Sequence, residues 1–339
     1  MDPALLSWLQ LALVAVVIVF AGARLSRYGQ GIARRTGLSG GWVGLVLVAT
    51  VTSLPELVSG ATAVTLADAP DVAVGNVLGA CVLNLAMIAL LDALHRKASI
   101  YSVASQGHAL GAGFAVLMLG AVGFALLLPA MSPGAMPVFG HVGLVTPMLF
   151  LLYAVAVRTI WQYEKRAGVA DELQEGEPEP LPLRALAIRY AVASAVVVAA
   201  ALALPFIATD LAHQMGWSQG FVGTLLVAAT TTLPEIAVTL AALRIGAIDL
   251  AIGNLLGSSL FNLAVLAIDD LLYTPGALYA AVAPTHALSV ASGVMMGGAV
   301  VIALIARHTA RLLNFISAAS LLIALLFFFN AWLQFRQGG

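Results

Sequence analysis

Long hydrophobic stretches dominate the pattern along the chain. Ten of them alternate with short polar segments, and each has the length of about 20 apolar residues that a membrane-spanning helix needs. They cover residues 4–23, 41–66, 71–92, 104–130, 139–160, 185–208, 219–243, 248–272, 281–306 and 310–334. This pattern predicts an all-α polytopic membrane protein with ten transmembrane helices.

One long polar segment divides these helices into two groups of five. Residues 162–183 are acidic and contain several prolines, which is typical of a solvated linker. The segment is too short to form a folded regulatory domain. The expected organisation is a first five-helix unit over residues 1–161, the linker, and a second five-helix unit over residues 184–339.

The composition excludes several classes of protein. Of the 339 residues, 61% are hydrophobic and only 9% are charged, whereas soluble domains carry about 25% charged residues. A net charge of −1 does not suit a protein that binds nucleic acid. Cys81 is the single cysteine, so the chain has no internal disulfide and no cysteine-rich metal cluster.

The basic residues predict an orientation. When ten spans are threaded alternately across a membrane, 14 of the 15 Lys and Arg residues fall on one side and only Arg336 falls on the other. Cytoplasmic loops collect Lys and Arg. We therefore expect an integral protein of the cell (inner) membrane with a cytoplasmic linker and with both termini outside.

The two halves of the chain contain matching segments. Residues 37–56 align with residues 216–235 at an offset of 179, and residues 71–84 align with residues 249–262 at an offset of 178. Pro-Glu, Gly-Asn and Asn match in register, which chance similarity between apolar helices does not produce. Because five is an odd number of spans, the second copy begins on the opposite side of the membrane. The sequence thus predicts two inverted repeats, an architecture of many secondary transporters.

Two acidic residues lie near the middle of predicted spans. Glu56 is the only ionisable residue of residues 41–66, and Glu235 is the only one of residues 220–243. A charge at this depth costs about 2.5–3.5 kcal/mol on insertion scales. No Lys or Arg lies in the middle of any span, so the remaining partners are a dication, two monovalent cations or protons. The alternative is a pair of kinked helices with protonated, hydrogen-bonded glutamates.

A proline precedes each of these glutamates. Pro55 and Pro234 lack an N–H group, so the carbonyls of Val51 and Thr230 lose their helical partners. Unpaired carbonyls are tolerated at this depth only where they face protein or a polar cavity. A hard cation such as Ca²⁺ would use them together with carboxylates and amides as ligands.

Small and amide residues recur on the third and eighth predicted helices. The glycine pairs Gly75/Gly79 and Gly253/Gly257 predict close approach between helices. The asparagines of these helices occupy two equivalent pairs of positions: Asn84 and Asn262 in the deeper pair, Asn76 and Asn254 in the other. We expect ion ligands at the deeper pair, with interhelical hydrogen bonds as the alternative, and the other pair suits both roles equally.

With these residues the chain resembles the calcium/cation antiporter superfamily, and within it the sodium/calcium exchanger branch. Residues 49–84 are similar to the first alpha repeat of that family, and residues 228–262 are similar to the second. The resemblance implies a secondary active antiporter that exchanges Ca²⁺ for Na⁺ by alternating access at a site with two glutamates. It implies no enzymatic activity.

The resemblance also implies roles for individual residues. Glu56 and Glu235 match the central carboxylates of the family. The positions that match ion ligands are Glu56, Glu235, Thr52, Thr231, Asn84, Asn262, Ser258, and the carbonyls of Ala49 and Ala228. A secondary set consists of Ser53, Thr232, Asn76, Asn254, Pro55 and Pro234.

Some positions depart from the family pattern. Asn262 stands where many sodium/calcium exchangers have an aspartate, and Ala80 stands where the inner sodium site has a serine. Two carboxylates balance one Ca²⁺, two Na⁺ or two H⁺. Exchange of Ca²⁺ or another divalent cation for H⁺ is therefore the main alternative, and a cation channel is a weaker one. No Ser-x-x-Lys pair lies within a span and no His-Glu-x-x-His motif occurs, which argues against an intramembrane hydrolase.

Two histidines recur with the repeats. His108 and His286 each begin a His-Ala-Leu sequence near the start of the fourth and ninth predicted helices. They are expected to serve as anchors at the membrane interface or as pH sensors, because histidine titrates near neutral pH. The expected partners of the chain are inorganic cations and membrane lipid. No cofactor, nucleic acid or protein partner is expected.

Overall fold

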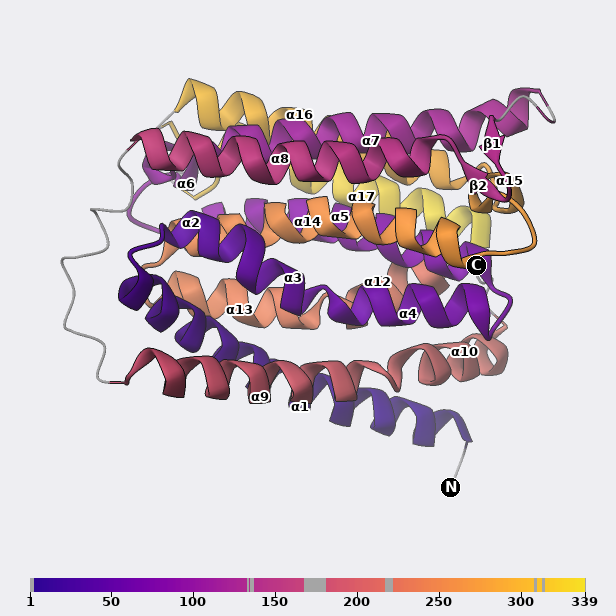
Figure 1. Cartoon of the computed structure of the whole chain (residues 1–339), viewed down its shortest axis with the longest axis horizontal. Coiled ribbons are helices and arrows are strands. Elements are labelled where there is room, and N and C mark those ends of the chain that lie inside the picture. The colour runs from indigo at the N-terminus through magenta and orange to yellow at the C-terminus, as the bar shows by residue number, and fades with distance from the viewer. Residues whose placement is uncertain are drawn as a thin grey trace.

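The structure is a computed structural model that describes residues 3–132, 134, 137–167, 181–216, 222–307, 310–312 and 315–338. Helices form almost all of this part of the chain (Figure 1). The elements of the first half are α1 (Pro3–Thr36), α2 (Gly40–Trp42), the π-helix η1 (Val43–Val48), α3 (Ala49–Thr52), α4 (Leu54–Thr65), α5 (Pro70–Leu94), α6 (Ile100–Val103), α7 (Gly107–Met131), β1 (Val138–Phe139), β2 (Val142–Gly143) and α8 (Val145–Ala167). Those of the second half are α9 (Leu183–Ala201), α10 (Leu204–Met215), the π-helix η3 (Val222–Val227), α12 (Ala228–Thr231), α13 (Leu233–Arg244), α14 (Ile248–Leu272), α15 (Leu278–Ala281), α16 (His286–Ala306) and α17 (Ala318–Gly338).

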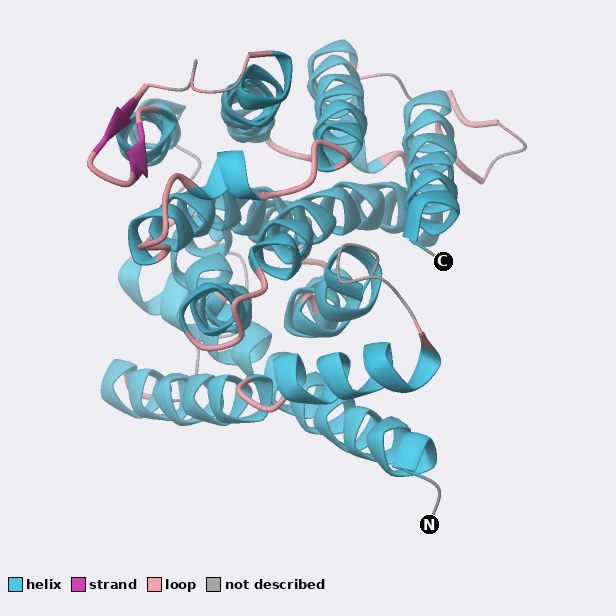
Figure 2. Cartoon of the chain, turned by 90° about the vertical axis from the view of Figure 1, so that its right-hand side faces the viewer, coloured by secondary structure: helices cyan, strands magenta, loops and turns pink. Residues whose placement is uncertain are grey.

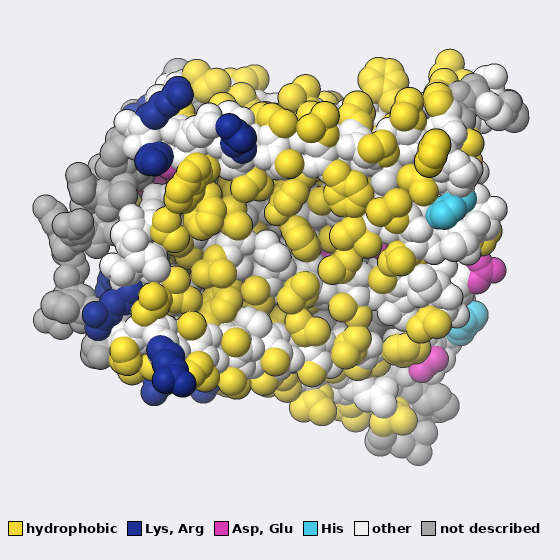
Figure 3. Space-filling model, in the orientation of Figure 1, with side chains coloured by type: hydrophobic (Ala, Val, Ile, Leu, Met, Phe, Trp, Pro, Cys, Tyr) yellow, Lys and Arg dark blue, Asp and Glu magenta, His cyan; other side chains and the backbone are white. Residues whose placement is uncertain are grey.

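The predicted membrane fold is confirmed. Within the described residues, nine helices are long and apolar enough to cross a membrane, and a helix pair bent by 49°, Thr224–Thr231 with Leu233–Arg244, brings the number to ten. Hydrophobic side chains cover the middle of the face in Figure 3, and Lys and Arg side chains gather toward its left end. We call this the basic end, and α1 begins and α17 ends at the opposite end (Figure 1).

The centre of the bundle is formed by α5 and α14, one helix from each repeat. In their spanning segments 72% and 89% of the residues are buried, compared with 22% in α1, α8, α9 and α17. The two central helices pack against each other, α5 packs against η3, and α14 packs against η1. Each central helix therefore contacts the broken helix of the other repeat, and this arrangement positions the candidate site.

Several predicted helix boundaries are wrong. The first helix does not end near residue 23, because α1 continues to Thr36 and packs against η1 and α9. In Figure 2, α1 runs from the mark N at an oblique angle to the helices that are seen end-on. The predicted span 139–160 begins with a short hairpin, β1–β2, which turns at Gly140 with a φ of 66°. The span 185–208 is divided between α9 and α10, and the span 310–334 becomes helical only at Ala318.

The predicted linker lies mostly outside the described residues. Its first residues, 162–167, still belong to α8, and α9 begins at Leu183. Residues 168–180 are not described.

Candidate functional site

A break in the helix precedes each candidate glutamate. In the first repeat, Ser53 separates α3 from α4 with φ −90° and ψ 6°, and Pro55 lies in the first turn of α4. In the second repeat, Thr232 separates α12 from α13 with φ −76° and ψ −2°, and Pro234 lies in the first turn of α13. Each glutamate follows its proline directly. It therefore sits at a new helix N-terminus, where the helix dipole favours a negative charge or a hydrogen-bonded carboxyl group.

The two glutamates are held by hydroxyl groups from opposite repeats. Ser53 donates a hydrogen bond of 2.8 Å to Oε1 of Glu235, and Thr232 donates one of 3.4 Å to Oε1 of Glu56. All four side chains have an exposed fraction of 0%. Each carboxyl group is therefore in contact with the break in the helix of the other repeat. The structure thus brings both acids together at the interface between the repeats, inside the bundle and away from lipid.

A second pair of hydrogen bonds follows the same symmetry. Thr52 donates to Oδ1 of Asn254 at 3.2 Å, and Thr231 donates to Oδ1 of Asn76 at 2.9 Å. Each bond joins the broken helix of one repeat to the central helix of the other. These two asparagines therefore hold the repeats together, while their oxygens already have donors.

The polar surroundings of the two glutamates differ. Ser258 donates a hydrogen bond of 3.2 Å to Oε1 of Glu235, but its equivalent in the first repeat is Ala80. Thr239 accepts a hydrogen bond of 3.2 Å from an asparagine of α14, and its equivalent is Gly60. The sequence alone did not single out Thr239, although the alignment of the repeats at an offset of 179 shows a hydroxyl residue where the first repeat has Gly60. The second repeat therefore surrounds its glutamate with more hydroxyl groups.

Four of the predicted ligand side chains retain oxygens without a hydrogen-bond partner. They are Oε2 of Glu56, Oε2 of Glu235, and Oδ1 of both Asn84 and Asn262, whose amide nitrogens also lack a partner. All four residues are fully buried. Burying a polar group without a partner is unfavourable, and carboxylate and amide oxygens are ligands that hard cations prefer. No group of three or more His, Cys, Asp and Glu side chains suited to a metal occurs in the described part of the chain. Of the four side chains named above, two are acids and two are amides.

The carbonyls of two alanines remain predicted ligands. The carbonyl of Ala49 accepts a backbone hydrogen bond of 3.0 Å from Ser53, and that of Ala228 accepts one of 3.0 Å from Thr232. The hydroxyls of Thr52 and Thr231 lie 3.2 and 3.3 Å from these carbonyls, but their single protons are shared with the asparagines of the central helices. An ion bound at either carbonyl would therefore share it with a backbone donor.

Glycines bring the helices of the two repeats into contact. A Cβ added at Gly257 would lie 2.6 Å from Cα of Leu45, and one added at Gly253 would lie 3.2 Å from the Leu45 nitrogen. A Cβ added at Gly79 would lie 2.7 Å from Cβ of Ala228. These contacts confirm the close approach predicted for three of the four glycines in the paired motifs.

The pseudo-symmetry axis passes close to the only cysteine. The Sγ of Cys81 donates to the carbonyl of Ser259 at 3.7 Å, and these two positions are related by the repeat offset of 178. Residues that the repeat makes equivalent touch each other only near the axis that relates the repeats. The axis therefore crosses the contact between α5 and α14.

Both repeats match one family of transporters. Residues 6–159 and 186–336 fit the model of the sodium/calcium exchanger protein family. The chain belongs to the sodium/calcium exchanger family. Proteins of this family are membrane transporters and not enzymes, and the chain has the antiporter fold of the family.

Proteins similar to this chain include two curated proteins and a solved structure. It is 30% identical to the putative antiporter CaxA of Alkalimonas amylolytica over 324 residues, which cover 92% of this chain and 94% of CaxA. It is 27% identical to the inner membrane protein YrbG of Escherichia coli over 268 residues, which cover 77% and 78%. The sodium-calcium exchanger NCX_Mj, solved after soaking with Na⁺ and Ca²⁺, has the same fold with a TM-score of 0.65, 20% identity, and coverage of 96% and 97%.

Two histidines connect the repeats at opposite ends of the bundle. Nε2 of His108 lies 2.8 Å from Asp249, and Nε2 of His286 lies 2.9 Å from Asp71. Both histidines are only 2% exposed, so they are not lipid-facing anchors. The aspartates were missed by the sequence analysis, although both begin the repeated segment that aligns at an offset of 178. The pH-sensing role of the histidines stays a prediction.

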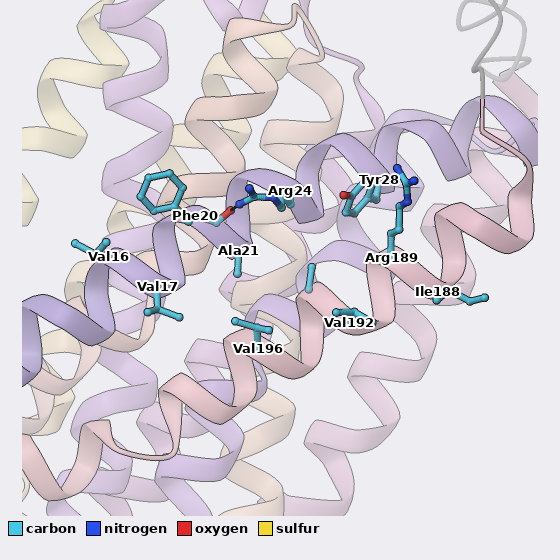
Figure 4. Close-up of a pocket in the computed structure, with 11 residues that line it drawn as sticks. Val16, Val17, Phe20, Ala21, Arg24, Tyr28, Ile188, Arg189, Val192 and Val196 are labelled. Atoms are coloured by element: carbon cyan, nitrogen blue, oxygen red, sulfur yellow. Dashed lines mark hydrogen bonds between the residues drawn. The ribbon is translucent and has the colours of Figure 1, made fainter.

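The protein also has a groove whose lining includes neither glutamate. It has a volume of about 460 Å³ and lies between α1 and α9 (Figure 4). Val16 and Val17 lie toward one end, Arg24 lies near the middle beside Phe20, and Tyr28 and Arg189 lie toward the other end. Most of the lining is apolar, with one arginine near the middle and one toward an end.

Proposed function

We propose that this chain is a secondary active antiporter that exchanges Ca²⁺ for Na⁺ by alternating access. The observation that carries the proposal is the set of fully buried oxygens without partners on the two carboxyl groups at the repeat interface and on two amide groups of the central helices α5 and α14. Such oxygens suit Ca²⁺, and two carboxylates balance its charge. Binding sites at the interface of inverted repeats are typical of secondary transporters.

The proposed ligands divide into two groups. Glu56 and Glu235 supply the charge, and Asn84 and Asn262 supply neutral oxygens beside them. Further proposed ligands are the Ser258 hydroxyl and the oxygens of Thr52, Thr231, Ala49 and Ala228. Ser53 and Thr232 position the carboxylates through the hydrogen bonds that cross between the repeats.

Coupling follows from the charge of the site. After release of its ion the site carries two like charges at bilayer depth, and moving them unloaded across the membrane is unfavourable. Two Na⁺ restore the same balance as one Ca²⁺. The cycle therefore proceeds only when one cargo replaces the other, and the two repeats expose the site alternately.

Protons are the second candidate counter-ion. Ala80 offers no hydroxyl, and Oε1 of Glu56 has one side-chain donor at 3.4 Å, whereas Oε1 of Glu235 has two, at 2.8 and 3.2 Å. A sodium ion near Glu56 would thus find fewer neutral ligands, whereas a proton needs none. The relative CaxA is named a putative antiporter, and the NCX_Mj structures describe ion exchange. Both relatives support antiport as the mode of transport.

Orientation and lipid contacts complete the proposal. We place the basic end in the cytoplasm of a cell with the chain in its inner membrane, so that both termini lie outside. Lipid acyl chains fill the groove between α1 and α9, and Arg24 and Arg189 meet anionic headgroups there. We keep the predicted organisation of two five-helix units joined by a linker, with the first unit extended to the end of α8 at Ala167 and the second beginning with α9 at Leu183.

The test is Ca²⁺ uptake into proteoliposomes under an imposed Na⁺ gradient or an imposed pH gradient. We expect the Na⁺ gradient to drive uptake in the wild type, and we expect Glu56→Gln and Glu235→Gln each to abolish it. Asp68→Asn, which changes an exposed acid outside the site, is the matched control. Normal uptake by either glutamine variant would remove the two-glutamate site, and uptake driven only by the pH gradient would select protons.

A further inference from the structure

A polar row on α14 continues beyond the candidate site. Asn254, Ser258, Asn262 and Asp269 follow one another at spacings of four, four and seven residues, which places them on one face of the helix. The equivalent row on α5 ends at Leu91, which lies 178 positions before Asp269. The final acid is therefore present in one repeat only.

The carboxyl group of Asp269 has no structural partner. It is fully buried, and neither of its oxygens has a hydrogen-bond partner. The adjacent Asp270 differs, because it accepts hydrogen bonds from the backbone N–H groups of Leu278 at 2.8 Å and Gly143 at 2.9 Å. Asp270 thus holds α15 and β2 in place. Asp269 makes no such bond, although an ionisable group inside a membrane bundle is costly.

Asp269 lies beside the helix that carries Glu56. A Cβ added at Gly60 would be 2.7 Å from Oδ1 of Asp269, so the carboxyl group rests against α4 at this glycine. Gly60 follows Glu56 by four residues, which is about 6 Å along a helix. Ser59 is also buried with an unpartnered hydroxyl. From there α4 runs to the end opposite the basic end (Figure 1), so polar groups extend from Glu56 toward that end.

The group that Asp269 can bind is a proton. Ion pairs among the described residues involve three other aspartates: Asp249, Asp71 and Asp92. A metal ion needs several ligands, and no cluster of three His, Cys, Asp and Glu side chains occurs in the ranges that the structure describes. Burial favours the neutral carboxyl over the charged form.

The titratable groups that face Asp269 do not replace this proton. On the elements around it they are Asp270 on α14 and Tyr279 on α15, Glu56 one helical turn before Gly60 on α4, and His141 between β1 and β2, whose ring contacts the carbonyl of Leu271 at 3.1 Å. Burial, followed by the negative charge of Asp270, raises the pKa of the Tyr279 phenol, so this group stays neutral. Glu56 and Asp270 are acids and cannot neutralise a second carboxylate, and His141 is partly exposed.

We infer that Asp269 is a proton-binding site on the ion route between Glu56 and the end of the bundle opposite the basic end, and that an arriving cation displaces its proton. The cation offsets the charge of the carboxylate, the O–H bond breaks, and the proton passes to water at that end. This deepens the proposed function and rests on it, because it assumes that cations pass along this route.

The first test needs no transport. Infrared spectra of the full chain in liposomes, with aspartate labelled with carbon-13, distinguish a protonated aspartic acid from protonated glutamic acids. We expect the ion-free wild type to show an aspartic acid carbonyl band, and we expect Ca²⁺ to diminish this band. Asp269→Asn and Asp269→Leu should each remove the band; leucine is the residue at the equivalent position 91 of the first repeat. Asp68→Asn is the control. Absence of the labelled band in the wild type would overturn the inference even if both variants failed to fold.

The second test separates the inference from the proposed function. Ca²⁺ uptake is measured against external pH, and we expect Asp269→Asn to retain uptake but to lose one titrating group, which makes its pH dependence shallower than that of the wild type and of Asp68→Asn. An unchanged profile would overturn the role of Asp269 while leaving antiport intact. A wild type that moves no Ca²⁺ would remove the proposed function, and the route with it.

Discussion

Ser258 provides a direct measure of the difference between the repeats. Its hydroxyl lies 3.2 Å from Oε1 of Glu235 and 3.4 Å from the hydroxyl of Thr52, and the side chain is fully buried. Ser258→Ala removes this oxygen without adding volume. Because the site is closed to solvent, water does not readily take the place of the lost group.

The expected loss follows from the energy of a buried hydroxyl. Leaving a buried polar partner unsatisfied costs about 1–3 kcal/mol, which corresponds to roughly 5- to 150-fold in affinity. We expect Na⁺ to show this loss, because a monovalent ion gains less from the carboxylates and depends more on neutral ligands. Ca²⁺ keeps both Glu56 and Glu235, so its affinity should fall by a smaller factor.

The assay is Ca²⁺ uptake into proteoliposomes with Na⁺ as the competitor. Ser258→Ala should raise the Na⁺ concentration that halves uptake more than it raises the Ca²⁺ concentration that half-saturates it. Ala80→Ser, which adds a hydroxyl at the equivalent position, should change Na⁺ competition in the opposite direction. Equal changes for both ions, or unchanged competition by Na⁺ in Ser258→Ala, would refute this account of ion selection.

Two further predictions concern packing and pH. Gly257→Ala should lower the melting temperature, because its Cβ would overlap the backbone of η1 and overpacking costs about 1–3 kcal/mol. Gly113→Ala is the control and should not lower it, because its Cβ meets nothing within 4 Å. Equal melting curves for the two variants would contradict the packing argument. Replacing His108 and His286 together by Ala should alter the dependence of flux on pH, because both His–Asp contacts between the repeats would be lost. A double variant with the wild-type pH profile would eliminate the sensing role.

The sequence predicts the membrane fold and the buried acids because insertion into lipid limits where charge occurs. Glu56 and Glu235 are conspicuous since no other ionisable residue shares their spans. Their partners are not predictable in this way. The bond from Ser53 to Glu235 depends on how the broken helices pack across the repeats, and a uniformly apolar helix gives little periodicity to indicate which face it turns inward.

Tertiary packing also decides the boundaries and the role of Asp269. Residues 24–36 are too polar to read as part of a span, yet they remain helical because α1 packs against α9 and η1 beyond the first apolar stretch. Asp269 lies three residues before the end of the predicted span 248–272, where an acid is expected to meet water. Its contact with Gly60 buries it instead, and only the folded chain reveals that contact.

The meeting of Cys81 with Ser259 has a mechanical consequence. If the inward-open and outward-open forms arise when the two halves trade shapes, a contact between symmetry mates maps onto itself and survives the exchange. The distance between the Cys81 thiol and the Ser259 carbonyl is then equal in the two end states. Contacts away from the axis instead lengthen in one half as their counterparts shorten in the other.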